Sequence, residues 1–212
     1  MYAIVSRQKT HLPAGTVMRM PGTWADYCAL RESRGDDSIP RLKYRNGEIL
    51  LMSPLPRHGR EASVISDIVK ILLDKDARNH ESFTPITIDI PEEGGIEPDY
   101  CFYIDNWQSA VGKSRIDWQV DPPPDLAIEI DVATYTSAED YSPYRVPEVW
   151  LFKRDVLKIY RLEDSGYSQQ SNSLFFPDVD LPTLVKRVMQ QALEQGTGAA
   201  LRSLRQNIEA KG

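Results

Sequence analysis

The stretch that decides the fold contains two short apolar segments that both carry carboxylates. They read EPDYCFYI (97–104) and PDLAIEIDV (124–132). In the second segment, large apolar residues occupy every other position, the period of two that is typical of a β-strand. One face of this strand is therefore apolar, and the other places Glu129 and Asp131 roughly 7 Å apart. If the two segments pair as neighbouring strands, Asp99 lies across from these acids.

Two interpretations account for acids in these positions. Clustered carboxylates repel one another, and a hard divalent cation that binds between them removes the repulsion. A strand with one solvated face also carries Asp and Glu, simply because that face meets water. Periodicity alone leaves both interpretations open. The neighbourhood favours the metal site, because Pro98-Asp99 is followed about thirty residues later by Glu129-x-Asp131 within an apolar run.

This pattern resembles the PD-(D/E)xK nuclease signature, with Asp131 where a lysine is usual. More specifically, the chain resembles the Uma-two family of restriction-endonuclease-like proteins, and the resemblance spans roughly residues 20–205. The strings that carry it, in this order and spacing, are RNGEILLMSP (45–54), RHGREASVISDIV (57–69), GIEPDYCFYI (95–104), PPPDLAIEID (122–131), VPEVWLF (146–152), LKIYRLE (157–163) and FFPDVDLPTLV (175–185).

The resemblance implies an α/β (α+β) fold with a central mixed β-sheet flanked by helices. It also implies a metal-dependent endonuclease that hydrolyses phosphodiester bonds in DNA, with Asp99 and Glu129 binding Mg²⁺ or Mn²⁺. Asp131 is a third candidate catalytic residue, either as a further metal ligand or as a base for the attacking water. Glu61 is a fourth candidate ligand, because acids of the first helix add a carboxylate in many nucleases of this fold. Its alternative is an exposed glutamate favoured by the helix dipole.

The missing lysine supports a second hypothesis. A carboxylate at position 131 cannot supply positive charge to a phosphodiester transition state, and the segment 135–144, where many relatives carry a lysine, has none. The alternative function is a catalytically inactive member of the same fold that binds nucleic acid or a protein partner.

The rest of the chain contributes further elements to the expected sheet and its helices. Thr23 is a plausible cap for a helix over 24–31, and Asn46-Gly47 suits the tight turn of a hairpin between 41–44 and 48–52. Apolar residues at helical spacing predict a helix over about 59–76. Further predictions are a strand over 82–90 that forms a hairpin with the Asp99 strand, strands over 146–152 and 156–162, and helices over 181–193 and 199–210.

The length of 212 residues and ordinary globular composition, 41% hydrophobic and 26% charged, suit a single folded unit with appendages. We expect an N-terminal arm (1–20), a restriction-endonuclease-like domain (21–190) and a C-terminal helical tail (191–212). Neither a Gly-rich phosphate loop nor a Gly-x-Ser-x-Gly elbow nor a dinucleotide fingerprint occurs, which argues against kinases, α/β-hydrolases and Rossmann dehydrogenases.

The segment 105–121 interleaves Trp107 and Trp118 with Lys113 and Arg115, a combination that could grip a nucleic-acid strand. A surface loop pinned by its tryptophans explains the same residues. The net charge of −6 argues against a general nucleic-acid binder, although it does not exclude a local basic patch.

Several features bear on location and assembly. No apolar run approaches the ~18 residues of a membrane helix, and the N-terminus lacks a signal-peptide core. Two cysteines in different elements suggest reduced thiols. We therefore expect a cytoplasmic protein without a membrane partner. Because nucleases that cut both strands of a duplex often pair, we also expect a homodimer.

Overall fold

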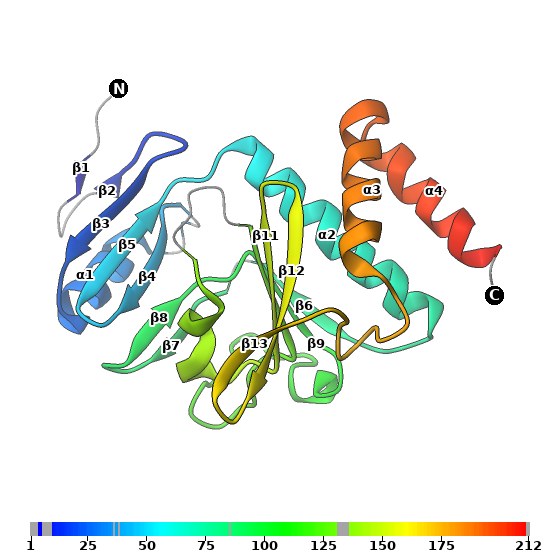
Figure 1. Cartoon of the computed structure of the whole chain (residues 1–212). Helices are drawn as coiled ribbons and strands as arrows, with labels where there is room; N and C mark the ends of the chain where they lie inside the picture. The colour runs from blue at the N-terminus through cyan, green and yellow to red at the C-terminus, as the bar shows by residue number, and fades with distance from the viewer. Residues whose placement is uncertain are drawn as a thin grey trace.

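A computed structural model describes residues 4–5, 10–35, 37, 39–84, 86–130 and 136–210, and its strands form two multistranded sheets (Figure 1). The first has six strands in the order β13-β12-β11-β10-β9-β6. All neighbouring pairs are antiparallel except β10 and β11, so this sheet is mixed. Its strands are β6 (Glu81–Phe83), β9 (Tyr100–Tyr103), β10 (Leu126–Ile130), β11 (Glu148–Lys153), β12 (Val156–Glu163) and β13 (Gly166–Gln170).

The second sheet has five antiparallel strands in the order β3-β5-β4-β8-β7. A separate two-stranded ribbon joins β1 (Ile4–Val5) to β2 (Thr10–His11). The strands of the second sheet are β3 (Val17–Pro21), β4 (Arg41–Arg45), β5 (Glu48–Met52), β7 (Ile88–Ile90) and β8 (Gly94–Ile96).

Two helices, α2 (Pro56–Lys75) and α3 (Leu181–Gln195), cover one face of the six-stranded sheet, and α4 (Thr197–Glu209) packs against both of them (Figure 1). The apolar stripe of α2 predicted from helical spacing is buried against Leu126, Ile128 and Ile130 of β10. Burying such a side chain stabilises the fold by about 1.5–3 kcal/mol. The predicted apolar face of β10 is therefore confirmed.

The opposite face of the six-stranded sheet is also buried. Ala127, Val149 and Leu151 pack with residues of β7, β8 and the 3₁₀ helix η2 (Ala138–Tyr144). All five residues of β10 are consequently buried. The interpretation of this strand as having one solvated face is wrong, because the second sheet and η2 cover the face on which Glu129 lies.

The remaining helix, α1 (Trp24–Arg34), covers the five-stranded sheet. Leu42 and Tyr44 of β4 pack against Tyr27 and Leu30 of this helix. Close packing also reaches β8, where a Cβ on Gly95 would lie 2.3 Å from the Tyr27 hydroxyl. Because residues of a strand alternate between faces, Arg41, Lys43 and Arg45 lie on the face of β4 away from α1.

Local signals predicted several of these elements well. Thr23 caps α1 through a capping box with Asp26. The hairpin of β4 and β5 turns at Asn46 and Gly47, both with positive φ. The predicted helix over 59–76 corresponds to α2, the last two helices correspond to α3 and α4, and the mixed α+β class is confirmed.

Two predictions about the sheets are wrong. The expected single strand over 82–90 is broken into β6, which pairs with β9, and β7, which pairs with β8 in the other sheet. The expected hairpin with the Asp99 strand is therefore replaced by a β7–β8 hairpin. The predicted central mixed sheet is the six-stranded one, and a second sheet was not expected; the chain crosses between the two sheets at both ends of the β7–β8 hairpin. The polar strand β13 was not predicted.

The expected domain boundaries fall inside elements of the structure. Position 20 lies within β3, which pairs with β5, and position 190 lies within α3, which packs in the main core. The 3₁₀ helix η1 (Trp107–Ser109) begins the long connection from β9 to β10. Among the described helices, none combines the length and apolar character needed to cross a membrane.

Candidate functional site

The candidate site begins where β9 and β10 run side by side. Their antiparallel register ends with Ile128 opposite Tyr100, so the next residue on each strand brings Glu129 beside Asp99. The backbone N–H of Ile130 donates a 2.7 Å hydrogen bond to Asp99 Oδ2 and holds the two strand ends together. The predicted juxtaposition of Asp99 and Glu129 is thus present in the structure.

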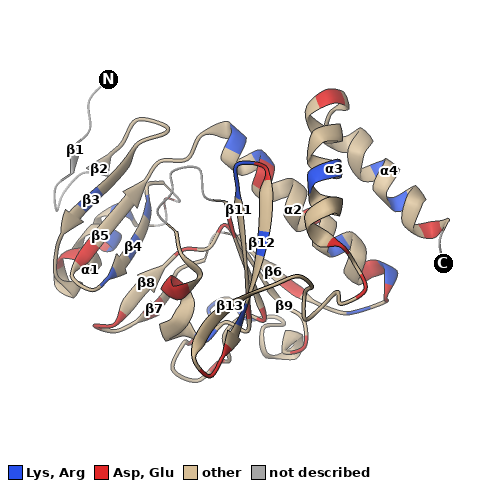
Figure 2. Cartoon of the chain, viewed as in Figure 1, with Lys and Arg blue, Asp and Glu red and all other residues tan. Residues whose placement is uncertain are grey.

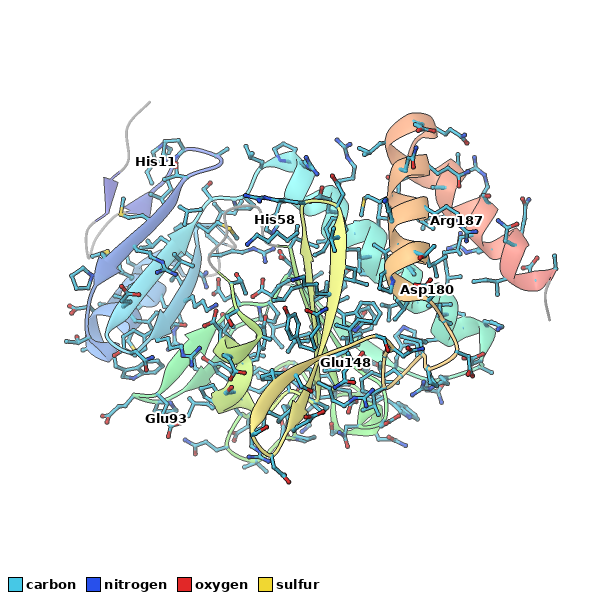
Figure 3. All side chains as sticks on the ribbon, in the orientation of Figure 1. His11, His58, Glu93, Glu148, Asp180 and Arg187 are labelled. Carbon is cyan, nitrogen blue, oxygen red and sulfur yellow. The ribbon has the colours of Figure 1, made fainter. Side chains whose placement is uncertain are left out.

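Asp99 is fully buried, and its carboxylate is held by groups from three other elements. In addition to the Ile130 N–H, Arg41 of β4 forms an ion pair with Oδ1, and His58 Nε2 lies 2.6 Å from the same oxygen. His58 belongs to the first turn of α2, and Figure 3 shows it at that end of the helix. A buried charge needs such partners, because desolvation alone would disfavour the ionised form.

Glu129 is also buried, but its environment is less favourable for a negative charge. Burial, followed by the negative charge of Asp99, raises the pKa of Glu129 from 4.5 to about 8. Lys43, the hydroxyl of Tyr141 and Arg41 act in the opposite direction. Tyr141 lies on η2 and donates a 2.7 Å hydrogen bond to Glu129 Oε1. A cation beside these two carboxylates would therefore be electrostatically stabilising.

Basic side chains of the five-stranded sheet complete the site. A cavity of about 40 Å³ is lined by Glu129 and Ile130 of β10 together with Arg41 and Lys43 of β4. Lys43 forms an ion pair with Asp140 of η2, and Arg45 Nη1 lies 2.7 Å from the same carboxylate. Burial alone would raise the pKa of Asp140, but the charge of Lys43 and the hydrogen bonds from Lys43, the Ser137 N–H and Arg45 outweigh it and leave this pKa lowered. The 3₁₀ helix η2 thus presents Tyr141 to Glu129 and Asp140 to Lys43.

The other acidic candidates have different surroundings. Glu61 is buried, and its carboxylate forms a 2.5 Å ion pair with Arg57, one turn earlier on α2. Arg57 in turn pairs with Asp155 in the turn between β11 and β12, and no described contact links Glu61 to Asp99 or Glu129. Asp131 lies outside the described residues, so its role remains a prediction.

The candidate nucleic-acid residues lie at a different cavity. Lys113 and Arg115 line a cavity of about 380 Å³ together with Trp118, and this cavity shares no residue with the one that contains Glu129. Lys113 pairs with Asp121, and Trp118 Nε1 donates a 3.0 Å hydrogen bond to the carbonyl of Thr87. These contacts give the loop a structural anchor and leave Arg115 exposed.

Several residues of the site were not predicted. Arg41 and Lys43 were assigned only to a hairpin strand, and Tyr141 and His58 were not among the predicted site residues. The signal that pointed to the first two was their alternation with apolar residues on β4, which places both on one face. Nothing in the local sequence indicates that this face opposes Glu129, since the two sheets meet through tertiary packing.

The donor chemistry of the site fits a hard divalent cation. Mg²⁺ is commonly bound by one or two carboxylates while retaining several waters, and Asp99 and Glu129 supply two. Among the described residues, no cluster of three or more Asp, Glu, His or Cys side chains forms a larger metal cage. Because Arg41 and His58 already contact Asp99 Oδ1, they would share the Asp99 carboxylate with a bound ion.

Comparison with known proteins assigns the chain to a family. The family model Uma2, described as "Putative restriction endonuclease", matches residues 24–193. No curated protein matches the chain.

Among solved structures, the chain is similar to the crystal structure of "a putative nuclease belonging to DUF820" from Anabaena variabilis ATCC 29413. The sequences are 16% identical, the match covers 85% of this chain and 99% of the other, and the TM-score is 0.48. The family model alone covers most of the chain, including β4, Asp99, Glu129 and η2. The chain therefore belongs to the Uma2 family, which is described as "Putative restriction endonuclease".

Proposed function

We propose that this protein is a metal-dependent endonuclease that hydrolyses phosphodiester bonds in DNA. The observation that supports this function best is the burial of Asp99 beside Glu129, where Glu129 lines a cavity that Arg41 and Lys43 also line. Carboxylates that can hold a cation, next to basic groups that can hold a phosphate, are the parts that phosphodiester hydrolysis requires. Membership of the Uma2 family agrees with this chemistry.

In this proposal, Asp99 and Glu129 hold Mg²⁺ or Mn²⁺. When bound, such an ion polarises a phosphoryl oxygen and lowers the pKa of water. The chain's own groups orient the ligands: the Ile130 N–H and His58 fix Asp99, and Tyr141 fixes Glu129. We propose Asp131 as a third catalytic residue that either binds the ion or accepts a proton from the attacking water, and Glu61 as a further ligand.

The test is cleavage of supercoiled and single-stranded DNA in the presence of Mg²⁺ or Mn²⁺. We expect wild type to nick and linearise plasmid, and Asp99→Asn and Glu129→Gln each to lose at least a hundredfold in rate. Glu209→Gln, an exposed residue of α4, is the matched control and should cut like wild type. Equal, negligible cutting by wild type and both site variants would overturn the endonuclease proposal.

One observation favours a second candidate function, a catalytically inactive scaffold that binds nucleic acid or a protein. Arg41 already forms an ion pair with Asp99, and a permanent internal cation of this kind would replace the metal. Titration with Mn²⁺ separates the two functions. The endonuclease should bind Mn²⁺ in a manner that Asp99→Asn abolishes, whereas an inactive scaffold should give the same negligible binding with and without this substitution.

We further propose that Lys113 and Arg115 contact the DNA beyond the cut site. Arg115 is exposed beside Trp118 at the larger cavity, which supports a role in gripping a strand. Replacing both by alanine should weaken binding to all DNA sequences alike and reduce its salt dependence. Unchanged affinity and salt dependence would leave the loop with a structural role.

We also propose that the protein acts as a homodimer, since cutting both strands of a duplex needs two sites. Light scattering at micromolar concentration tests this directly. A mass near 48 kDa, about twice the 24.1 kDa of one chain, is expected, and a monomeric mass would end the proposal.

A further inference from the structure

The basic residues of β4 form an ordered row. Leu42 and Tyr44 are buried beneath α1, whereas Arg41, Lys43 and Arg45 share the opposite face of the strand. Successive members of the row are roughly 7 Å apart at the strand rise. In Figure 2, basic segments mark β4 within the five-stranded sheet. A protein with a net charge of −6 thus carries a local line of positive charge beside its buried acids.

Lys43 lies between two cavities. It lines the small cavity with Glu129, and it also lines a neighbouring cavity of about 230 Å³. The second cavity is also lined by Arg19, Arg45 and Asn46, together with the acids Glu48 and Asp140. Because Leu50 is also common to both cavities, they adjoin at the middle of the row. A chain with regularly spaced negative charges could occupy both.

Lys43 and Arg45 can still bind an anion although both are paired with an acid. Lys43 and Arg45 both pair with the single carboxylate of Asp140. A lysine ammonium has three donors and an arginine guanidinium has five, so one carboxylate does not saturate them. The side chain of Lys43 is 15% exposed, so its ammonium is largely desolvated and its contact with an anion is correspondingly stronger.

We propose that β4 provides the phosphate-binding surface of the site, with Lys43 contacting the phosphate that is cut and Arg45 contacting the next phosphate along the strand. This inference deepens the proposed endonuclease function and rests on it. It gives Lys43 the positive charge that position 131 cannot supply, because an aspartate stands there. Asp140 acts as a positioning residue that holds both cations until a phosphate arrives.

Substitution of Lys43 tests the proposal at the step of cleavage. Lys43→Met removes the charge but retains the stem, Lys43→Arg retains the charge, and Lys158→Met, on the exposed face of β12, is the matched control. We expect Lys43→Met to reduce kcat about 10²–10³-fold, the range for removing one group that stabilises transition-state charge. Lys43→Arg should recover at least tenfold of this loss, and Lys158→Met should cut like wild type.

A binding measurement keeps this inference distinct from the endonuclease proposal. In a Glu129→Gln background with Mg²⁺, anisotropy of a labelled oligonucleotide at several salt concentrations reports phosphate contacts. Adding Lys43→Met or Arg45→Met should weaken binding and reduce the slope of log K against log salt by about 1 each. Thermal unfolding of every variant verifies that it is folded, and Lys43→Arg controls for loss of the Asp140 contact.

The outcomes separate the two proposals. If wild type cuts DNA and Lys43→Met behaves like Lys158→Met in both assays, the phosphate-binding role of β4 is overturned. The endonuclease proposal is then retained. If wild type does not cut but binding depends on Lys43 and Arg45, the endonuclease fails and the phosphate-binding surface stands. Absence of any oligonucleotide binding by the folded protein overturns the surface as well.

Discussion

The hydroxyl of Tyr141 on η2 donates a 2.7 Å hydrogen bond to Glu129 Oε1 on β10. This bond stabilises the ionised carboxylate and lowers the pKa of Glu129, opposing the effects of burial and of Asp99. Tyr141→Phe should therefore raise the pKa of Glu129 further. Because a metal binds the deprotonated carboxylate, we expect Mn²⁺ affinity at pH 7 to fall about 3–10-fold, as calorimetry would measure.

The neighbouring tyrosine of the same 3₁₀ helix provides the control. Tyr144→Phe removes a hydroxyl that lies against Gly94 of β8 and makes no described contact with Glu129. Its Mn²⁺ affinity should match that of wild type. Equal affinities for wild type and Tyr141→Phe would show that the hydroxyl does not tune the site.

The raised pKa of Glu129 also predicts how stability depends on pH in the metal-free protein. Below the unfolded value of 4.5 the group is protonated in both states, so its contribution to stability is complete. Between 4.5 and about 8 the folded protein holds a proton that the unfolded chain has released. Stability should therefore fall as pH rises through this window, by about 2–4 kcal/mol.

Urea denaturation with EDTA at pH 5.5, 7 and 8.5 measures this dependence. Glu129→Gln should remove most of the fall in unfolding free energy, and at pH 8.5 it should be more stable than wild type. Glu209→Gln, which changes an exposed carboxyl, should reproduce the wild-type curve. A wild-type curve that is flat, or that rises over this range, contradicts the raised pKa.

The sequence predicted one half of the candidate site and missed the other. Alternation within 124–132 placed Glu129 on one face of its strand, and Asp99 was expected beside it if the two strands paired, which they do. Arg41 and Lys43 could be assigned to one face of a hairpin, but a period of two does not indicate which other element that face meets.

The same limit explains the split of the strand expected over 82–90. Its alternation was real, but alternation does not distinguish one strand of one sheet from two strands that pair with different partners. β6 joins β9, and β7 turns back onto β8, so the chain leaves one sheet for the other within this segment. His58 was missed for a related reason: its burial depends on where the start of α2 meets Asp99, which helical spacing does not specify.

The ion pair between Arg41 and Asp99 connects the two sheets, and we predict strong energetic coupling between these residues. The side chain of Arg41 is 15% exposed and that of Asp99 is fully buried. Removing one partner leaves the other charge buried, a change that typically costs 3–5 kcal/mol. A double-mutant cycle of Arg41→Met and Asp99→Asn, measured by urea denaturation, should give a coupling energy of about 1–3 kcal/mol.

Arg57 and Glu61 of α2 offer a comparison in which only one partner, Glu61, is buried. The side chain of Arg57 is 56% exposed, so its ion pair is screened by water. Coupling between Arg57→Met and Glu61→Gln should remain below about 1 kcal/mol. If both cycles gave the same small coupling, Arg41 would not be the group that stabilises the buried charge of Asp99.

Glu148 is a buried carboxylate for which we predict a purely structural role. Its Oε1 accepts hydrogen bonds from Trp150 Nε1 at 2.7 Å and from Ser173 Oγ at 2.5 Å, and its Oε2 accepts one from the Leu174 N–H at 2.6 Å. It begins β11, opposite Leu126 in the parallel register, whereas Glu129 lies opposite Leu151. Figure 3 accordingly shows Glu148 well separated from His58.

Glu148→Ala leaves two buried donors and one part-buried donor without an acceptor, so we expect it to lower the free energy of unfolding by about 3–5 kcal/mol. Glu148→Gln retains one acceptor and should cost about 1–3 kcal/mol. Below the melting temperature of each variant, Mn²⁺ affinity and DNA cleavage should equal those of wild type. A folded Glu148→Gln protein that had lost Mn²⁺ binding would place this carboxylate in the functional site, because no change in folding would then account for the loss.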